Sequence, residues 1–165
     1  MSAYEAAEAA PTLVIGVGNE ALGDEGVGIH VVRALLEQGL PPHVRIVEGG
    51  TGGWGLLGHL EGVRRLVLVD AMAMGRPPGT VVALRPEEVR RLSPPDRTSL
   101  HGTSLLDVLE LAATLELQPP EVCIVGIQPA YVGWGLELSP TVRRAVHEAV
   151  EAVLRAIRYP PQAIR

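Results

Sequence analysis

A chain of 165 residues is long enough to form one domain with a continuous hydrophobic core. Its 14 basic residues are all arginine and are outnumbered by 19 acidic residues, and the resulting net charge of -5 argues against nucleic acid as a partner, because phosphate binding needs a concentrated basic face. The single cysteine, Cys123, can form neither an internal disulfide nor a paired-cysteine metal site, which favours a reducing cytoplasm.

Residues 1–11 are acidic, lack a basic start and contain no long apolar run. They match neither a signal peptide nor a membrane anchor, so we expect a disordered or frayed tail and no membrane contact. Residues 12–158 are expected to form a single α/β domain, and residues 159–165 a C-terminal tail.

Short apolar runs alternate with longer amphipathic segments, which is typical of strands and helices in an α/β domain. The runs predicted as strands are, in chain order, residues 13–17, 44–47, 66–69, 80–84 and 122–127. Helical spacing and cap signals predict helices over residues 26–38, 54–60, 103–117 with Thr103 as N-cap, and from the N-cap Ser139 to about Ile157. Residues 86–95 are predicted to be a connector.

The turn over residues 75–79, with the sequence GRPPG, separates the third and fourth predicted strands. It is too short for the crossover that a parallel pair needs, so the fourth strand is expected to pair antiparallel at an edge. The sequence therefore predicts a three-layer α/β fold. Its sheet is twisted, five-stranded and mostly parallel, with one antiparallel edge strand and helices on both faces.

The loop after the first strand, GVGNEALGDEGVG over residues 16–28, loosely fits a dinucleotide-binding fingerprint through Gly16, Gly18 and Ala21. However, Asp24 and Glu25 would face the diphosphate. Like unit charges about 4 Å apart repel by roughly 4 kcal/mol at an effective dielectric constant of about 20. A dinucleotide-binding domain is therefore the weaker alternative. Asp24 is interpreted as a helix-capping acid, whereas for Glu25 capping and chemistry carry equal weight.

Acidic residues occur where several predicted strands end. Glu25 follows the first strand, Glu48 ends the second, Asp70 ends the third, and His101 precedes a long predicted helix. Each residue has an ordinary structural explanation, but ligands of an open α/β sheet bind beyond the carboxyl ends of its strands. A divalent cation would relieve the repulsion among the carboxylates, and mixed oxygen and nitrogen ligands suit zinc, nickel or iron better than calcium or magnesium.

Five motifs give the chain a resemblance to a known family. They are GVGNEALGDEGVG from residue 16, EGGTGG from 48, VLVDA from 67, SLHGTSLLDVL from 99 and VGIQPAYVGWGLELSPTV from 125. In these motifs the chain resembles the hydrogenase maturation proteases, which trim the C-terminal extension from the large subunit of nickel-iron hydrogenases. The resemblance implies that Glu25, Asp70 and His101 bind nickel. It also implies a functional role for Glu48, the acid that precedes the GGT loop.

The resemblance further implies a processing endopeptidase that acts on the hydrogenase large-subunit precursor after nickel insertion. Because no motif for a covalent nucleophile is found, and because Cys123 lies within a predicted strand, we expect an activated water. Glu25, Asp70 and Glu48 are the catalytic candidates. The nickel is expected to arrive with the precursor, and zinc or another divalent ion is a substitute in vitro. A non-catalytic nickel-binding chaperone is the main alternative.

The protein is expected to be cytoplasmic and monomeric, with a homo-oligomer left open. The glycine loop over residues 49–53 is a candidate groove for an extended peptide, although tight-turn chemistry explains it equally well. Trp54 and Trp134 are candidates for lining that groove, while packing is the more common role of a tryptophan.

Overall fold

The computed structural model describes residues 10–92 and 105–159. Four sequence predictions lie wholly or largely outside these residues: the N-terminal tail, the C-terminal tail, the N-cap Thr103 and the candidate ligand His101. The domain boundaries at residues 12 and 158 therefore stay predictions.

Five strands form one sheet in the spatial order β2-β1-β3-β5-β4. They are β1 (Thr12–Val17), β2 (Val44–Gly50), β3 (Arg65–Ala71), β4 (Val81–Leu84) and β5 (Glu121–Ile127). Strands β2, β1, β3 and β5 are parallel, and β4 pairs antiparallel with β5 at one edge. The structure thus confirms the mostly parallel sheet and its antiparallel edge strand.

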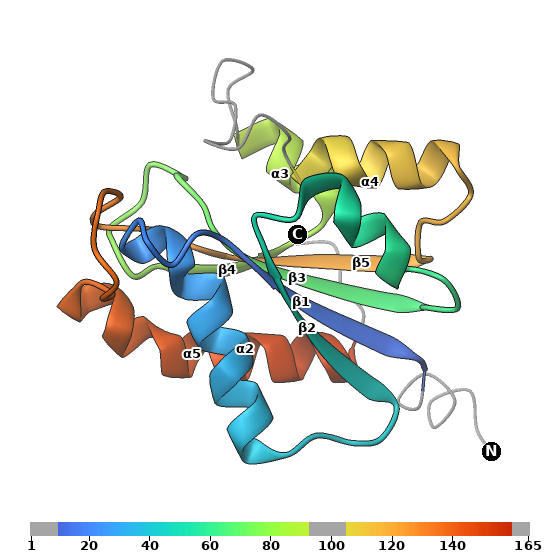
Figure 1. The fold of residues 1–165 in the computed structure, drawn as a ribbon, viewed down its shortest axis with the longest axis horizontal. Helices are drawn as coiled ribbons and strands as arrows, with labels where there is room; N and C mark the ends of the chain where they lie inside the picture. The colour runs from blue at the N-terminus through green and yellow to red at the C-terminus, as the bar shows by residue number, and fades with distance from the viewer. Residues whose placement is uncertain (1–9, 93–104, 160–165) are drawn as a thin grey trace.

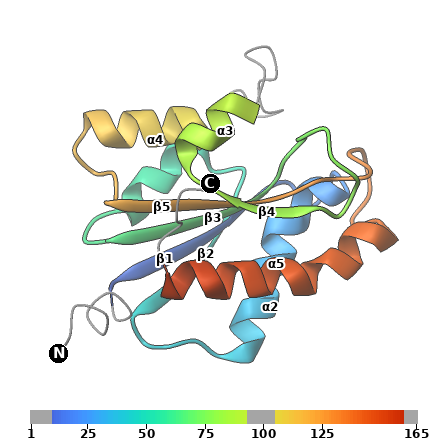
Figure 2. The ribbon, with the colours of Figure 1, turned by 180° about the vertical axis from the view of Figure 1, so that it is seen from behind.

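The helices cover both faces of the sheet, which gives the three layers seen in Figures 1 and 2. Helix α2 (Val27–Gln38) and helix α5 (Pro140–Arg158) pack together on one face. The other face carries α4 (Leu105–Thr114), α3 (Pro86–Leu92) and the 3-10 segment η2 (Gly53–His59). Within the described residues, no helix combines the length and apolar character that crossing a membrane requires.

The central strands divide their side chains between two hydrophobic clusters. In β3, Val67 and Val69 join the cluster under α2 and α5, whereas Leu66 and Leu68 join the cluster under α4 and η2. A strand that is buried on both faces is a continuous apolar run with no alternation of apolar and polar residues. This is why β3 could be predicted from its apolar run alone.

One element was predicted wrongly. Residues 86–92 form helix α3 and are not part of a connector. Pro86 supplies the first helical position, and Oε2 of Glu88 accepts a hydrogen bond from the backbone N–H of Arg85 at 2.7 Å. Acidic residues in its first turn and basic residues in its last turn both suit the helix dipole. With only seven residues, the segment is too short to show helical periodicity in the sequence.

Two glycines of the first loop allow α2 to approach the sheet closely. A Cβ atom on Gly28 would lie 2.3 Å from the carbonyl oxygen of Val69 and 2.4 Å from that of Val17. A Cβ atom on Gly16 would lie 2.4 Å from the carbonyl oxygen of Gly28. Gly16, the first glycine of the loose dinucleotide fingerprint, and Gly28 therefore serve helix-sheet packing, because protein backbone fills the space beside them.

We predict that Gly28→Ala lowers the free energy of unfolding by roughly 3 kcal/mol, because the added methyl group meets two backbone carbonyls that cannot rotate away. Urea unfolding followed by circular dichroism measures the change. Gly58→Ala is the matched control, since nothing lies within 4 Å of a Cβ atom at that position. Equal stability of the two variants would contradict the tight contact.

Candidate active site

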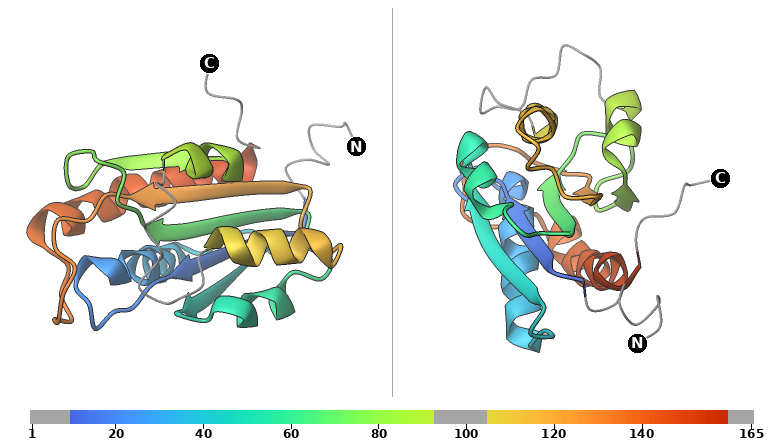
Figure 3. Two further views of the ribbon diagram at one scale, coloured as in Figure 1. Left: turned by 90° about the horizontal axis from the view of Figure 1, so that it is seen from above. Right: turned by 90° about the vertical axis from the view of Figure 1, so that its right-hand side faces the viewer.

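The loops that follow β1 and β5 meet at the carboxyl edge of the sheet. They lie side by side in Figure 1, in blue and dark orange, and again in the left panel of Figure 3. Isolated bridges join Leu22 to Gly135 and Gly23 to Val132. This edge is where an open α/β sheet binds its ligands, and it contains the predicted site residues Glu25, Asp70 and Glu48.

Glu25 and Asp70 come together at this edge. Glu25 lies in the 3-10 segment η1 (Asp24–Gly26), which packs against β3, and Asp70 is the penultimate residue of β3. Gly18 makes this approach possible, because its φ is +138° and a Cβ atom there would lie 1.9 Å from the carbonyl oxygen of Glu25. The chain must therefore fold back tightly to bring Glu25 toward β3.

The surroundings of Asp70 penalise its negative charge. Burial and then the charge of Glu25 raise the pKa of Asp70 well above its ordinary value, and a backbone hydrogen bond with Ala71 only partly offsets them. The oxygens of two neighbouring carboxylates can both bind a divalent cation, and the cation would offset their repulsion. The donor chemistry thus fits a cation held by Glu25 and Asp70.

The third predicted ligand, His101, lies outside the described residues. Among residues 10–92 and 105–159, no group of three histidine, cysteine or acidic side chains is arranged to hold a metal ion. Only the Glu25–Asp70 pair of the predicted nickel site can therefore be placed, and the complete ligand set stays a prediction.

Glu48 lies near the carboxyl end of β2, where it pairs in register with Gly16 of β1. Its Oε1 accepts a hydrogen bond from Nε of Arg33, and the two guanidinium NH groups of Arg33 contact the carboxylate of Glu20. All three side chains are substantially exposed, so solvent screens these ion pairs and they add little to stability. Glu48 is thus oriented by Arg33, while its predicted catalytic role is untested.

Asp24 does not cap a helix, so that interpretation was wrong. The N-cap of η1 is Gly23, and no side chain caps that segment. The fully buried carboxylate of Asp24 instead accepts hydrogen bonds from the backbone N–H groups of Ala130, Tyr131 and Ser139, at 2.7–2.9 Å, and from the hydroxyl of Ser139 at 2.7 Å. Burial raises the pKa of Asp24, but these bonds outweigh it and hold that pKa below its ordinary value.

Two further residues of this edge escaped the sequence analysis. Arg33 was not singled out, although its place on the first predicted helix could have suggested a partner for an acid of the preceding loop. Gln128 connects the segments that follow β3 and β5, because its Oε1 accepts hydrogen bonds from the backbone N–H groups of Met74 at 2.7 Å and Arg76 at 3.3 Å. No local sequence signal identifies that contact.

Cys123 is buried in β5, as predicted, and burial raises the pKa of its thiol to about 12. A thiol with this pKa is almost entirely protonated at neutral pH and is a poor nucleophile. The structure therefore confirms Cys123 as a core residue.

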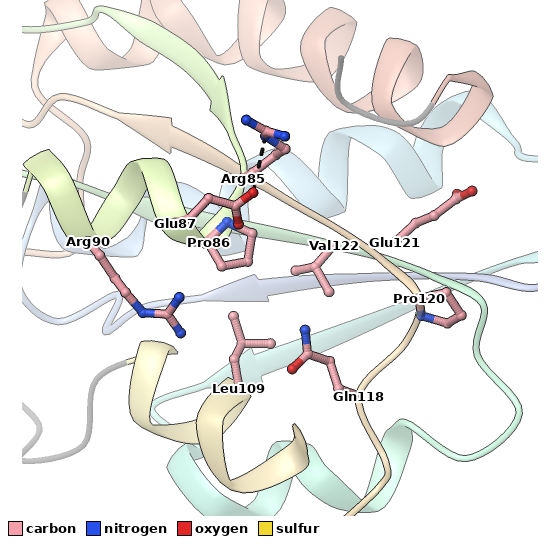
Figure 4. A pocket seen from close by; sticks show the side chains of 9 residues that line it. All are labelled: Arg85, Pro86, Glu87, Arg90, Leu109, Gln118, Pro120, Glu121 and Val122. Carbon is pink, nitrogen blue, oxygen red and sulfur yellow. Dashed lines mark ion pairs between the residues drawn. The ribbon is translucent and has the colours of Figure 1, made fainter. Parts of the chain in front are cut away.

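A pocket of about 350 Å³ lies away from this edge, between α3, α4 and the start of β5 (Figure 4). Arg85 and Arg90 are its basic lining residues, and Glu87 and Glu121 are its acidic ones. Arg85 is paired with Glu87 at 3.4 Å. The basic and acidic lining residues balance in charge. The pocket lies at the amino end of β5, roughly 20 Å along the strand from the carboxyl edge, so it is separate from the Glu25–Asp70 pair.

The comparisons with known proteins agree on one family. Residues 29–156 match the hydrogenase maturation protease family model. The chain is 38% identical over 148 residues to the hydrogenase 2 maturation protease of Escherichia coli, covering 88% of this chain and 90% of that protein.

Solved structures show the same relationship. The hydrogenase maturating endopeptidase HybD from E. coli superposes with a TM-score of 0.80 at 39% identity, covering 89% of this chain and 91% of that one. The [NiFe] hydrogenase maturation protease HybD from Thermococcus kodakarensis superposes with a TM-score of 0.75 at 31% identity, covering 88% and 98%. The chain is therefore a peptide-bond hydrolase that belongs to the hydrogenase maturation protease family.

Proposed function

We propose that this chain is the endopeptidase that removes the C-terminal extension of a nickel-iron hydrogenase large-subunit precursor after nickel insertion. The observation that carries the proposal is the adjacent Glu25–Asp70 pair at the carboxyl edge of the sheet. The names of the relatives, which describe hydrogenase maturation proteases and endopeptidases, support the substrate class.

In this proposal the nickel ion is part of the substrate and serves as the recognition element. Glu25 and Asp70 bind it with negatively charged oxygens, and His101 completes the ligand set. An ion between the two carboxylates removes the repulsion that disfavours the charge on Asp70. Precursor that lacks nickel would leave that repulsion in place, so cleavage becomes conditional on metal loading.

We assign the attack on the scissile amide to an activated water, because the sequence has no motif for a serine nucleophile and Cys123 is buried. A carboxylate can accept the proton of the attacking water, which makes the reaction aspartic-type in the broad sense. Glu48 is our candidate for this role, since the N–H of Arg33 fixes one of its oxygens and orients the other.

The test combines the purified protein with large-subunit precursor prepared with and without nickel. Mass spectrometry should show loss of a C-terminal fragment only from the nickel-loaded precursor. An unchanged mass with verified nickel loading and verified binding would favour a nickel-binding chaperone instead. We place the reaction in the cytoplasm and expect a monomeric protein, which sedimentation velocity checks.

We predict that Glu48→Gln lowers kcat for cleavage by about 100-fold or more while leaving precursor binding nearly unchanged. Single-turnover cleavage and a separate binding titration provide the two values. Glu20→Gln is the matched control, because Glu20 is the other carboxylate bound by Arg33. If both variants lose activity equally, Arg33 is the important group. Full activity of Glu48→Gln would remove Glu48 from the mechanism.

A further inference from the structure

The loop between β5 and α5, residues 128–138, presents large apolar side chains to solvent. Trp134 is 84% exposed and Leu136 is 75% exposed, and Tyr131 and Val132 are also exposed. Glu137 is the loop's single charged residue. Isolated apolar residues are ordinary on a protein surface, but four within six consecutive positions form a patch of the kind found at protein interfaces.

The backbone of this loop is fixed by hydrogen bonds to the segment that precedes Glu25. The N–H of Gly23 donates to the carbonyl of Gly135 at 2.8 Å, and the N–H of Gly135 donates to the carbonyl of Ala21 at 3.0 Å. The N–H of Asp24 donates to the carbonyl of Tyr131 at 3.0 Å. The Asp24 carboxylate also accepts hydrogen bonds from the N–H groups of Ala130 and Tyr131 in the loop, and from the N–H and hydroxyl of Ser139 directly after it.

The side chains of Trp134 and Leu136 therefore do not hold the loop in place. Polar contacts order the backbone, and the apolar groups face solvent. An ordered loop that already displays its apolar groups loses little conformational entropy on binding. Tryptophan and tyrosine are also enriched where binding energy concentrates at protein interfaces.

The position of the loop identifies its partner. Residues 21–24 hold the loop, and the next residue in the chain is Glu25. Consecutive Cα atoms are about 3.8 Å apart, so a protein substrate that reaches Glu25 lies directly beside the loop. The enzyme hydrolyses a peptide bond in a protein substrate. The substrate surface next to that bond must therefore contact part of this edge of the sheet.

We propose that the 128–138 loop is the docking surface for the hydrogenase large-subunit precursor, with Trp134 and Leu136 inserted against an apolar patch beside the C-terminal extension. This inference rests on the proposed function and adds the surface that selects the precursor. The loop binds the body of the substrate, whereas Glu25 and Asp70 bind its metal.

The test measures binding and cleavage of nickel-loaded precursor by the Trp134→Ala and Leu136→Ala variants. Each substitution should raise Kd and KM at least tenfold and leave kcat within about twofold, because a docking contact acts before the chemical step. The native thermal midpoint should be retained, since both side chains are exposed. Leu36→Ala is the matched control: Leu36 is 56% exposed on α2 and lies toward its far end, next to the C-cap Gly39.

The outcomes separate the two proposals. If the wild-type protein cleaves the precursor and both loop variants match it in Kd and KM, the docking surface is wrong and the proposed function stands. If the wild-type protein binds but never cleaves, the proposed function fails, while weaker binding by Trp134→Ala still supports docking. A wild-type dimer that Trp134→Ala or Leu136→Ala converts to monomer would assign the loop to self-association and overturn the inference.

Discussion

Replacing Asp70 with asparagine will reduce release of the C-terminal fragment from nickel-loaded precursor by at least about 1000-fold, a loss within the range for groups that act directly on the reacting centre. The amide keeps the size of the side chain but removes the charged oxygen that would bind the cation. It also removes the repulsion between residue 70 and Glu25. We therefore expect Asp70→Asn to have a thermal midpoint equal to or above that of the wild-type protein.

Opposite changes in activity and stability distinguish a functional acid from a structural one. Fragment release is measured by mass spectrometry under single-turnover conditions, and unfolding by calorimetry. Glu25→Gln should reduce fragment release as Asp70→Asn does, because it removes the other charge of the pair. Glu37→Gln, an exposed acid near the end of α2, should change neither quantity. Wild-type cleavage by Asp70→Asn would exclude a role for this pair in binding the substrate's metal.

Much of the fold could be predicted because the signals are local. The five apolar runs correspond to the five strands, and the short GRPPG turn led correctly to the antiparallel pairing of β4. The cap of α5 was also readable, since the Ser139 side chain accepts a hydrogen bond from the N–H of Val142. The boundaries of the strands were underestimated at β2 and β3, where residues 48–50 and residues 65, 70 and 71 extend the strands beyond the apolar runs.

The candidate site was only partly predictable, because its contacts join distant segments. The carboxyl ends of parallel strands meet at one edge, and this rule alone placed Glu25 near Asp70. No such rule shows that Arg33 holds Glu48, or that Gln128 binds the backbone after β3. Asp24 illustrates the difficulty best: its local sequence suggests a cap, but its partners lie more than 100 residues away.

Asp24→Asn is the second substitution from which we expect a large effect, here on stability. Every described partner of the Asp24 carboxylate is a donor: three backbone N–H groups and the hydroxyl of Ser139. An asparagine has one acceptor oxygen, and its amide group would point hydrogen atoms at other donors. At least one buried N–H then lacks an acceptor, which costs about 1–3 kcal/mol for each such group.

We therefore expect Asp24→Asn to lower the free energy of unfolding by about 3 kcal/mol, equivalent to roughly 6–12 °C in the thermal midpoint of a domain this size. Ser139→Ala is the comparison, because it leaves the other three bonds to Asp24 in place while it removes one donor to Asp24 and the N-cap of α5. Its loss should be smaller, and the Asp24→Asn/Ser139→Ala double variant should lose less than the sum, since both substitutions break the same bond.

The same substitution tests how the first loop and the 128–138 loop depend on each other. If Asp24 holds them together, Asp24→Asn should weaken precursor binding even below its thermal midpoint, because Trp134 and Leu136 would lose their fixed backbone. Binding that stays at the wild-type level, in a variant whose stability has fallen as expected, would mean that the bridges from Leu22 and Gly23 suffice to position the loop. In that case Asp24 stabilises the fold without organising the substrate surface.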